Sequence, residues 1–240
     1  MSQQEKVYLD LEANAFFLRN INKIDLRNKG IRSSKENIFS NILSYLGPSI
    51  NGLDVLEVGC FIGDLLGKLK NDFQCKVVGI EPSSLACQYS LKEFGLHLIN
   101  NTYDRTDYFS LRQSNRHAFD IIVVDDVLSW MSREIILPVL ASLDWLLKPG
   151  GIIYIRDFCP PVDFAFPNHH QPDSDVYNYK VSGGHKKFFI CTGHYLIAQE
   201  YIRSSQEFQV VTTSRLDSSI WSDAILLKTK DPLHPRLKMD

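Results

Sequence analysis

Apolar and polar positions follow two different spacings along the middle of the chain. The segments between the first three of five short apolar runs, and the segment 132–147, carry apolar residues three and four positions apart, which predicts helices. Strands that alternate with helices predict a mostly parallel sheet with helices on both faces, which is an α/β fold. The runs that we expect to be strands are residues 54–58, 76–80, 96–99, 119–124 and 152–155.

The two ends of the chain show different patterns. Near the N-terminus, Ser33 and Glu36 have the spacing of a capping box ahead of a helical apolar face. After residue 191 we expect one helix over 192–202, followed by two strands over 208–213 and 220–227. No helix fits between these two runs, so they should pair antiparallel at the end of the sheet.

Composition and charge exclude several classes of protein. The 240 residues are 44% hydrophobic and carry a net charge of −2, so bulk charge does not hold the chain to nucleic acid or to a membrane. The five cysteines are scattered without a Cys-x-x-Cys pair, which argues against a disulfide framework and favours reduced thiols. We see no signal peptide and no apolar stretch of membrane-spanning length, so we expect a cytoplasmic protein.

A glycine turn follows the first predicted strand, in the stretch VLEVGCFIGDLLGKL that begins at Val55. Gly59 and Gly63 would let the backbone approach a ligand where a Cβ would collide. Glu81 ends the second strand about twenty residues later, where a carboxylate can accept both hydroxyls of a ribose. The turn lacks the Gly-x-Gly-x-x-Gly spacing of dinucleotide sites, and Glu57 would repel phosphate there but could hold a cation.

Four motifs in order resemble those of class I S-adenosylmethionine-dependent methyltransferases. They are Glu57-x-Gly59-x-x-x-Gly63, Glu81 followed by Pro82, FDIIVVDD at 119–126 and LLKPGGIIYIRDF at 146–158. The resemblance covers residues 52–158 and the final antiparallel pair. It implies a Rossmann-like doubly wound sheet with an antiparallel last strand, and S-adenosyl-L-methionine as the cofactor. The commoner turn of this family has glycine where this chain has Phe61, although catechol-type O-methyltransferases also tolerate an aromatic residue there.

The resemblance also implies which residues surround the cofactor. Glu57 and Gly59 would face its methionine end, Glu81 would take the ribose hydroxyls, and Asn101 or Thr102 would lie near the adenine. Two acids at the end of the fourth strand would lie between cofactor and substrate, although the second could instead cap the next helix. The cofactor-binding residues that we expect are Glu57, Gly59, Cys60, Phe61, Gly63, Glu81, Pro82, Asn101, Thr102 and Asp125.

We expect a single domain over residues 1–240. Its parts would be a helical N-terminal lid (1–50), a cofactor-binding core (51–157), a substrate-cap insertion (158–191) and a C-terminal helix with an antiparallel strand pair (192–240). The segment YLDLEANAFFLRN resembles the leading segment that packs over the cofactor in small-molecule methyltransferases, although an ordinary amphipathic helix explains the same pattern. As a lid it would bring four residues near the site, namely Tyr8, Phe16, Phe17 and Arg19.

In this family the segment after the fifth strand commonly covers the methyl acceptor. Here it is rich in histidine, lysine and aromatic residues, and transfer to oxygen needs a base for the hydroxyl proton. The leading candidate is His185, which two glycines precede and two lysines follow, with His194 and Asp126 as the other catalytic candidates. The alternative is a loop whose histidines only bond its own backbone. The substrate-binding candidates are Tyr179, Lys186 and His169.

Missing motifs exclude some classes of methyl acceptor and of mechanism. The fourth strand ends in DDVL, without the Asn/Asp-Pro-Pro-aromatic run of adenine-N6 enzymes or the Pro-Cys pair of RNA cytosine-C5 enzymes, so we expect no nucleic-acid substrate. A metal-assisted mechanism of the catechol type needs an Asp-Asn pair after the fifth strand. That position reads Asp157-Phe158, so one ligand is missing and we expect no catalytic metal.

The function expected from the sequence is methyl transfer from S-adenosylmethionine to a small polar or anionic metabolite, such as a sugar, a sugar nucleotide or a natural-product intermediate. Transfer to oxygen is favoured. One alternative is a non-catalytic sensor or scaffold that binds the cofactor, and another is a methyltransferase of protein side chains. The expected partners are a small-molecule substrate and a possible second copy of the chain, with no membrane.

Overall fold

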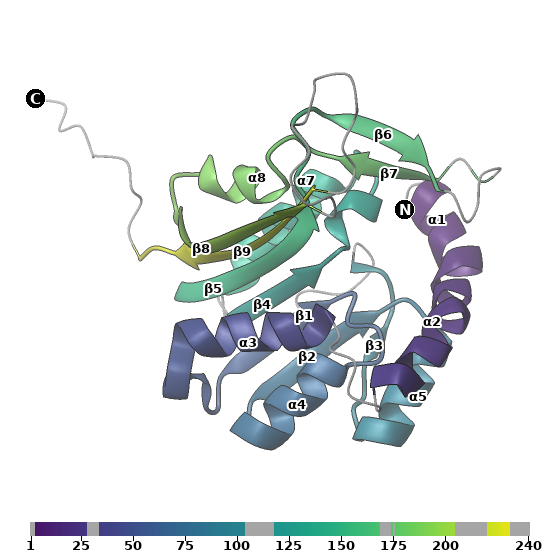
Figure 1. Ribbon diagram of the computed structural model, residues 1–240, viewed down its shortest axis with the longest axis horizontal. Helices are drawn as coiled ribbons and strands as arrows, with labels where there is room; N and C mark the ends of the chain where they lie inside the picture. Colours follow the sequence, from purple (N-terminus) through teal and green to yellow (C-terminus); the bar gives the residue numbers. More distant parts are fainter. Residues whose placement is uncertain are drawn as a thin grey trace, which may run out of the picture.

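A seven-stranded sheet forms the centre of the molecule, in the order β3-β2-β1-β4-β5-β9-β8 (Figure 1). The computed structural model describes residues 3–27, 34–103, 118–168, 174, 176–204 and 220–230. A separate hairpin pairs β6 (Phe164–Pro167) with β7 (Tyr177–Lys180). The strands of the sheet are β1 (Asp54–Val58), β2 (Lys76–Glu81), β3 (Ile99–Asn100), β4 (Phe119–Asp125), β5 (Leu147–Phe158), β8 (Tyr195–Ser204) and β9 (Ile220–Lys228).

The helices precede the sheet and connect its strands. Those before β1 are α1 (Gln3–Val7), the π-helical turn η1 (Tyr8–Glu12), α2 (Ala13–Arg27), α3 (Ser34–Leu46) and the 3-10 turn η2 (Gly47–Ile50). Those between the later strands are α4 (Asp64–Phe73), α5 (Ser84–Phe94), the 3-10 turn η4 (Leu128–Trp130), α7 (Ile136–Leu146) and α8 (Lys186–Ile190).

The sheet has the predicted mostly parallel arrangement. β1 pairs in parallel with both β2 and β4, and β3 and β5 extend the parallel part on either side. β9 is antiparallel to its neighbours β5 and β8. The order of the parallel strands reverses between β1 and β4, and ligands of open α/β sheets bind beyond the carboxyl ends of the strands at such a point.

The two faces of the sheet are buried by different helices. Alternate residues of each central strand point to opposite faces. Leu56, Ile122 and Ile153 therefore pack with the α7 helix, whereas their neighbours Val55 and Ile121 pack with α3 and α4. In α3 the predicted apolar stripe has this role, because Ile38 and Ile42 are fully buried against the second face. The proposed capping residue Ser33 lies outside the described residues.

The C-terminal part differs from the prediction. The expected helix over 192–202 is wrong, because most of this segment belongs to the strand β8. Its apolar and aromatic residues fit a helical spacing, but they have high strand propensity, and pairing with β9 decides the structure. The predicted strand over 208–213 lies outside the described residues, and β8 is the strand that pairs with β9 on the side away from β5.

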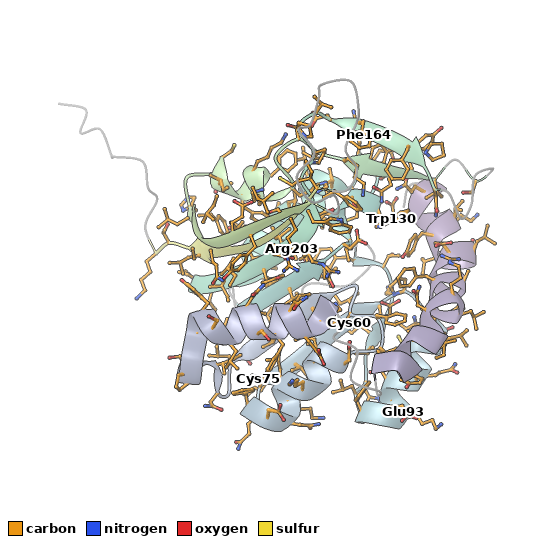
Figure 2. All side chains as sticks on the ribbon, in the orientation of Figure 1. Cys60, Cys75, Glu93, Trp130, Phe164 and Arg203 are labelled. Carbon is orange, nitrogen blue, oxygen red and sulfur yellow. The ribbon has the colours of Figure 1, made fainter. Side chains whose placement is uncertain are left out.

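Two segments that are far apart in the sequence lie together at one end of the sheet. In Figure 1, α1, η1 and α2 run down one side of the molecule, and the β6–β7 hairpin lies beside the first of them. Figure 2 shows Trp130, the last residue of η4, below the hairpin and on the same side as these helices. The hairpin strand β7 contacts η4 directly.

Candidate active site

A cavity of about 260 Å³ lies where the strand order reverses. Residues from the ends of β1, β2 and β4 form its floor, and residues from α1, η1 and α2 form its opposite wall. Of the predicted cofactor-binding and catalytic residues, eight line it: Gly59, Phe61, Glu81, Pro82, Asn101, Thr102, Asp125 and Asp126. The structure therefore brings together most of the predicted cofactor site and one of the three catalytic candidates.

The turn after β1 has a backbone that a ligand could approach closely. Gly59 has a φ of 67°, and a Cβ placed on it would collide with the Val127 side chain. Phe61 also adopts a positive φ, 54°, and its ring packs edge-on to the Phe16 ring at 5.5 Å between centroids. Gly63 begins α4 with a φ of 72° and does not line the cavity. Cys60 also does not line it and is fully buried behind the turn.

Glu81 is a buried carboxylate that lines the cavity and also supports the turn. It accepts hydrogen bonds from the backbone N–H of Phe61 at 2.9 Å and of Ser83 at 2.8 Å. Burial raises the pKa of Glu81 to about 7, although these two hydrogen bonds oppose the shift. A ribose hydroxyl pair would give this carboxylate the additional donors that favour its charged form.

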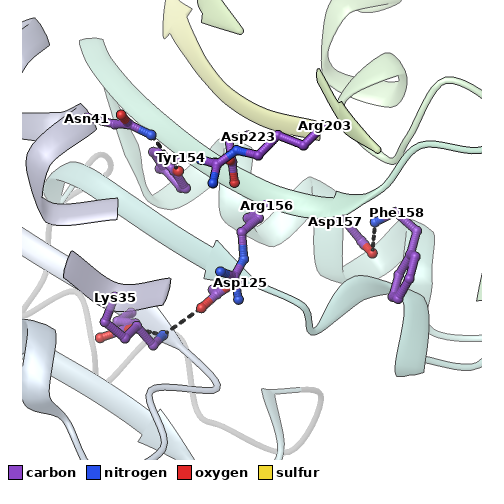
Figure 3. A network of polar contacts seen from close by, with 10 residues as sticks. Lys35, Asn41, Asp125, Tyr154, Arg156, Asp157, Phe158, Arg203 and Asp223 are labelled. Carbon is purple, nitrogen blue, oxygen red and sulfur yellow. Dashed lines mark hydrogen bonds and ion pairs between the residues drawn. The ribbon is translucent and has the colours of Figure 1, made fainter. Parts of the chain in front are cut away.

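A network of charged side chains extends from the lining of the cavity, which includes Lys35, Asp125 and Arg156 (Figure 3). Lys35, from the first turn of α3, forms an ion pair with Glu57, and its Nζ lies 3.1 Å from Asp125 Oδ2. Arg156 pairs with the other oxygen of Asp125. Burial alone would lower the pKa of Lys35, but Glu57 and Asp125 outweigh burial and raise it well above its usual range. Glu57 is fully buried, and Lys35 rather than Glu57 lines the cavity.

The sequence prediction did not include Lys35 or Arg156. The one signal available was indirect: a buried acid such as Glu57 needs a cationic partner. Sequence spacing cannot say which lysine or arginine supplies it, because α3 precedes β1 and its packing is a tertiary contact.

The N-terminal segment α1, η1 and α2, here called the lid, lines the cavity, and its role as a lid stays a prediction. Tyr8 and Phe16 line the cavity. Phe17 packs on Phe61, and Arg19 is paired with Glu12, another lining residue.

Polar contacts fix this lid at both ends. The Gln4 side chain donates to Trp130 O at 2.6 Å and to Tyr177 O at 2.9 Å, and it accepts from Tyr177 N at 3.2 Å. At the other end Asn14 Oδ1 accepts from Ser83 Oγ at 2.8 Å. The lid thus joins the β6–β7 hairpin to the start of α5.

Asp126 occupies the end of the cavity nearest to η4. It follows β4 with a φ of 55°, and the lining continues through Val127 to Trp130 and Met131. Burial raises the pKa of Asp126 to about 8, with a further contribution from Asp157. A carboxyl group with this pKa can accept a proton near neutral pH.

The other acceptor-side candidates do not line this cavity. His185 is buried, with Nδ1 2.8 Å from Asp157 Oδ2. His194 precedes β8 at the opposite edge of the sheet, beside Thr229. Lys186 Nζ is held by Gly183 O at 2.6 Å and by Glu200. Tyr179 lies under the Arg133 guanidinium, and His169 falls outside the described residues.

The described part of the chain lacks two further features. No helix there is long and apolar enough to cross a membrane. No group of three or more His, Cys, Asp and Glu side chains there has the arrangement of a metal site, and independence from metal stays a prediction.

Sequence comparison finds a family model and a curated relative. Residues 55–151 match the model described as a methyltransferase domain. An uncharacterized protein of Rickettsia prowazekii is 27% identical over 109 residues, which are 45% of this chain and 44% of that protein. The chain thus matches less than half of the length of this curated relative.

Solved structures resemble the whole fold. The 1,6-didemethyltoxoflavin-N1-methyltransferase of Burkholderia thailandensis, crystallised with 1,6-didemethyltoxoflavin and S-adenosylhomocysteine, has a TM-score of 0.62 and 13% identity, over 96% of this chain and 92% of that one. The N-methyltransferase NodS of Bradyrhizobium japonicum WM9, in complex with S-adenosylhomocysteine, has a TM-score of 0.54 and 15% identity, over 95% and 99% of the two chains. Residues 55–151 therefore resemble a methyltransferase domain, and the chain has the class I, Rossmann-like fold of S-adenosylmethionine-dependent methyltransferases, as the four sequence motifs predict.

Proposed function

We propose that this protein transfers a methyl group from S-adenosylmethionine to a small polar metabolite, with a hydroxyl oxygen as the favoured acceptor. The observation that carries this proposal is the joint lining of one cavity by the predicted cofactor residues and by Asp126. A protein that only held the cofactor would not need a carboxyl group of raised pKa in the same cavity.

The residues present fit the cofactor. Gly59 leaves space that a Cβ would fill, and Glu81 suits a ribose. Asn101, Thr102 and Lys35 line the same cavity, where the first two would lie near the adenine and Lys35 would meet a carboxylate at the methionine end. When bound, S-adenosylmethionine supplies an electrophilic methyl group on a sulfonium.

The chain's own contribution is orientation, exclusion of water and removal of a proton. Tyr8, Phe16 and Trp130 enclose the cavity with aromatic surface, which holds an acceptor in a dry and restricted position. Asp126 accepts the proton of the attacking hydroxyl. We therefore move the role of base from His185 to Asp126, because only Asp126 of the three candidates lines the cavity.

The charges of the cavity favour a neutral acceptor over an anionic one. Glu5, Glu12 and Asp126 line it, whereas the lining cations Lys35 and Arg156 are both paired with Asp125. A neutral or protonated amine fits the same acidic lining, so an amine nitrogen is the second candidate acceptor. Two of the structurally similar proteins are N-methyltransferases by name.

The test is a direct search for the product. The purified protein is incubated with S-adenosylmethionine carrying a labelled methyl group and with fractions of small-molecule extract, and products are detected by mass. Label in a small molecule, absent with Asp126→Asn, is the expected result. Label only in protein would favour the side-chain methyltransferase. Cofactor binding without any labelled product would favour the sensor or scaffold.

We also propose a cytoplasmic location and a homodimer. The five cysteines are unpaired, which suits the reduced thiols of a cytoplasmic protein. A homodimer stays a prediction, which sedimentation of the purified chain tests.

A further inference from the structure

The hairpin strand β7 carries a buried basic residue, Lys180, whose amino group lies over the Phe158 ring at the end of β5. Asp126 lies beside the same end of β5, because its backbone N–H donates to Arg156 O at 2.8 Å. Burial alternates along β7: Asn178 is 0% and Lys180 is 2% exposed, whereas Tyr177 is exposed. Because β7 contacts η4, the buried face of this strand points toward the ends of β4 and β5. Lys180 therefore faces the interior, although it belongs to the insertion that follows β5.

Aromatic rings and acids surround the Lys180 amino group. Its Nζ lies over the Phe158 ring, 5.5 Å from the Phe166 centroid and 6.0 Å from the Trp221 centroid. No hydrogen-bond partner of this Nζ is found in the described part of the chain. Burial lowers the pKa of Lys180 to about 8, although two neighbouring acids, Asp126 and Asp157, oppose the shift.

Asp126 has the complementary environment. It lines the cavity, and its Oδ1 also has no hydrogen-bond partner among the residues described. Other acids disfavour its charge, whereas Lys180 and Arg156 favour it. The titratable and charged groups that act on Asp126 come from four elements: Asp125 of β4, Arg156 and Asp157 of β5, Lys180 of β7 and Tyr8 of η1.

Arg156 is less able than Lys180 to stabilise the negative charge of Asp126. Its guanidinium is paired with Asp125, which is itself the second partner of Lys35. His185 is paired with Asp157. Among the described residues, Lys180 is thus the cation of this cluster that forms no ion pair with another acid.

We propose that Lys180 is a positioning residue for the methyl transfer: its positive charge favours the ionised form of Asp126, and the ionised Asp126 takes the proton of the acceptor. This inference rests on the proposed function. In the step, the acceptor O–H bond breaks and an O–CH₃ bond forms, while the C–S bond breaks and its electron pair stays on sulfur. The proton goes to the Asp126 carboxylate. Lys180 exchanges no atom and acts through its charge.

A binding experiment tests this without knowledge of the acceptor. S-adenosylmethionine and S-adenosylhomocysteine differ by one methyl group and by the positive charge on sulfur. Protein groups whose titration changes the affinity for both ligands equally therefore do not affect the ratio of the two Kd values. An ionised Asp126 favours the charged ligand. With the wild type, Kd for S-adenosylhomocysteine divided by Kd for S-adenosylmethionine should rise as pH increases from 6 to 9.5, with a midpoint near the pKa of about 8. Asp126→Asn should abolish the rise.

The Lys180 variants then separate charge from structure. Lys180→Met removes the cation and should move the midpoint up by about one pH unit or more. Lys180→Arg keeps a cation that never loses its proton, so the midpoint should stay or fall below that of the wild type. A Lys180→Met midpoint equal to that of the wild type would overturn the inference, and so would an upward shift with Lys180→Arg.

The outcomes also separate this inference from the function on which it rests. If neither ligand binds the wild type, the proposed function fails. If both bind and the ratio does not respond to pH or to Asp126→Asn, only the inference fails. If Lys180→Met does not fold, the other two variants still decide, because Lys180→Arg predicts a midpoint at or below that of the wild type and Asp126→Asn predicts the loss of the rise.

Discussion

At the scale of single residues, Glu81 has two functions, one in the turn and one in the cavity. Glu81→Gln keeps one of the two oxygens that accept from the turn, loses the other, and removes the charge offered to the ribose. We expect S-adenosylhomocysteine to bind this variant more weakly by about 1.5–3 kcal/mol, the worth of a charge-assisted hydrogen bond. Calorimetry measures this, and the smaller loss expected for an analogue without ribose hydroxyls gives the share that comes from the turn. Unchanged affinity for S-adenosylhomocysteine would contradict the ribose assignment.

Lys35 is the residue whose loss leaves the most buried charge without compensation. Lys35→Met should lower the free energy of unfolding by about 3–5 kcal/mol, because Glu57 then remains buried without a cation. The double variant Lys35→Met/Glu57→Gln removes both members of the pair and should recover much of this loss. Urea unfolding of the four proteins in this cycle gives the coupling energy. Additive effects would mean that the ion pair contributes little.

The Asp126 carboxyl makes stability depend on pH. Its pKa is raised to about 8 from 3.8, so the folded state holds a proton that the unfolded state has released. The free energy of unfolding should therefore fall as pH rises from about 5 to about 8. Asp126→Asn removes this dependence and should be more stable than the wild type at pH 8.5 by at least about 1 kcal/mol. Thermal unfolding across this range checks the sign.

At the scale of elements, the turn between β1 and α4 requires glycine for two reasons that a control can separate. Gly59 and Gly95 both have positive φ values, 67° and 61°, but only at Gly59 would a Cβ meet a neighbour. Gly95→Ala should cost about 1 kcal/mol from backbone strain. Gly59→Ala should cost more, because the Val127 side chain must move, and it should also weaken cofactor binding. Equal losses of stability and normal binding would show that the cavity tolerates this shift.

The lid formed by α1, η1 and α2 is held by a few buried contacts. Phe17 is 7% exposed and packs on Phe61, whereas its neighbour Leu18 is 60% exposed. Phe17→Ala should therefore release S-adenosylhomocysteine at least about ten-fold faster, since about 1.4 kcal/mol of lost packing suffices for that factor. Leu18→Ala is the matched control and should leave the dissociation rate unchanged. Stopped-flow displacement measures both rates.

Local sequence patterns predict those elements whose residue types alone indicate burial or a special backbone conformation. The runs at 54–58 and 119–124 are recognisable as central strands because most of their side chains are apolar, and the glycine turn is recognisable because its backbone needs glycine. The helix predicted over 192–202 fails because β8 is an edge strand. Its exposed apolar residues, such as Ile197 and Ile202, do not alternate with polar ones.

At the scale of the whole molecule, the site depends on contacts that no local pattern contains. The motifs predict the floor of the cavity, since Gly59, Glu81 and Asp126 end adjacent strands. Lys35 and Lys180 enter from segments outside the motifs, and only packing brings them there. The expected histidine base illustrates the same limit: His185 has the right chemistry, but its place beside Asp157 is set by the tertiary fold.

The bonds between Gln4 and Tyr177 join residues 173 positions apart. Contacts of such separation form late, because the entropy of closing the loop between them must first be overcome. During synthesis the ribosome releases the first helix long before the hairpin that completes its docking site. A growing chain that already contains the glycine turn and Glu81 therefore still lacks the docked N-terminal wall of the cavity. The cavity can enclose a ligand fully only after β7 has left the ribosome.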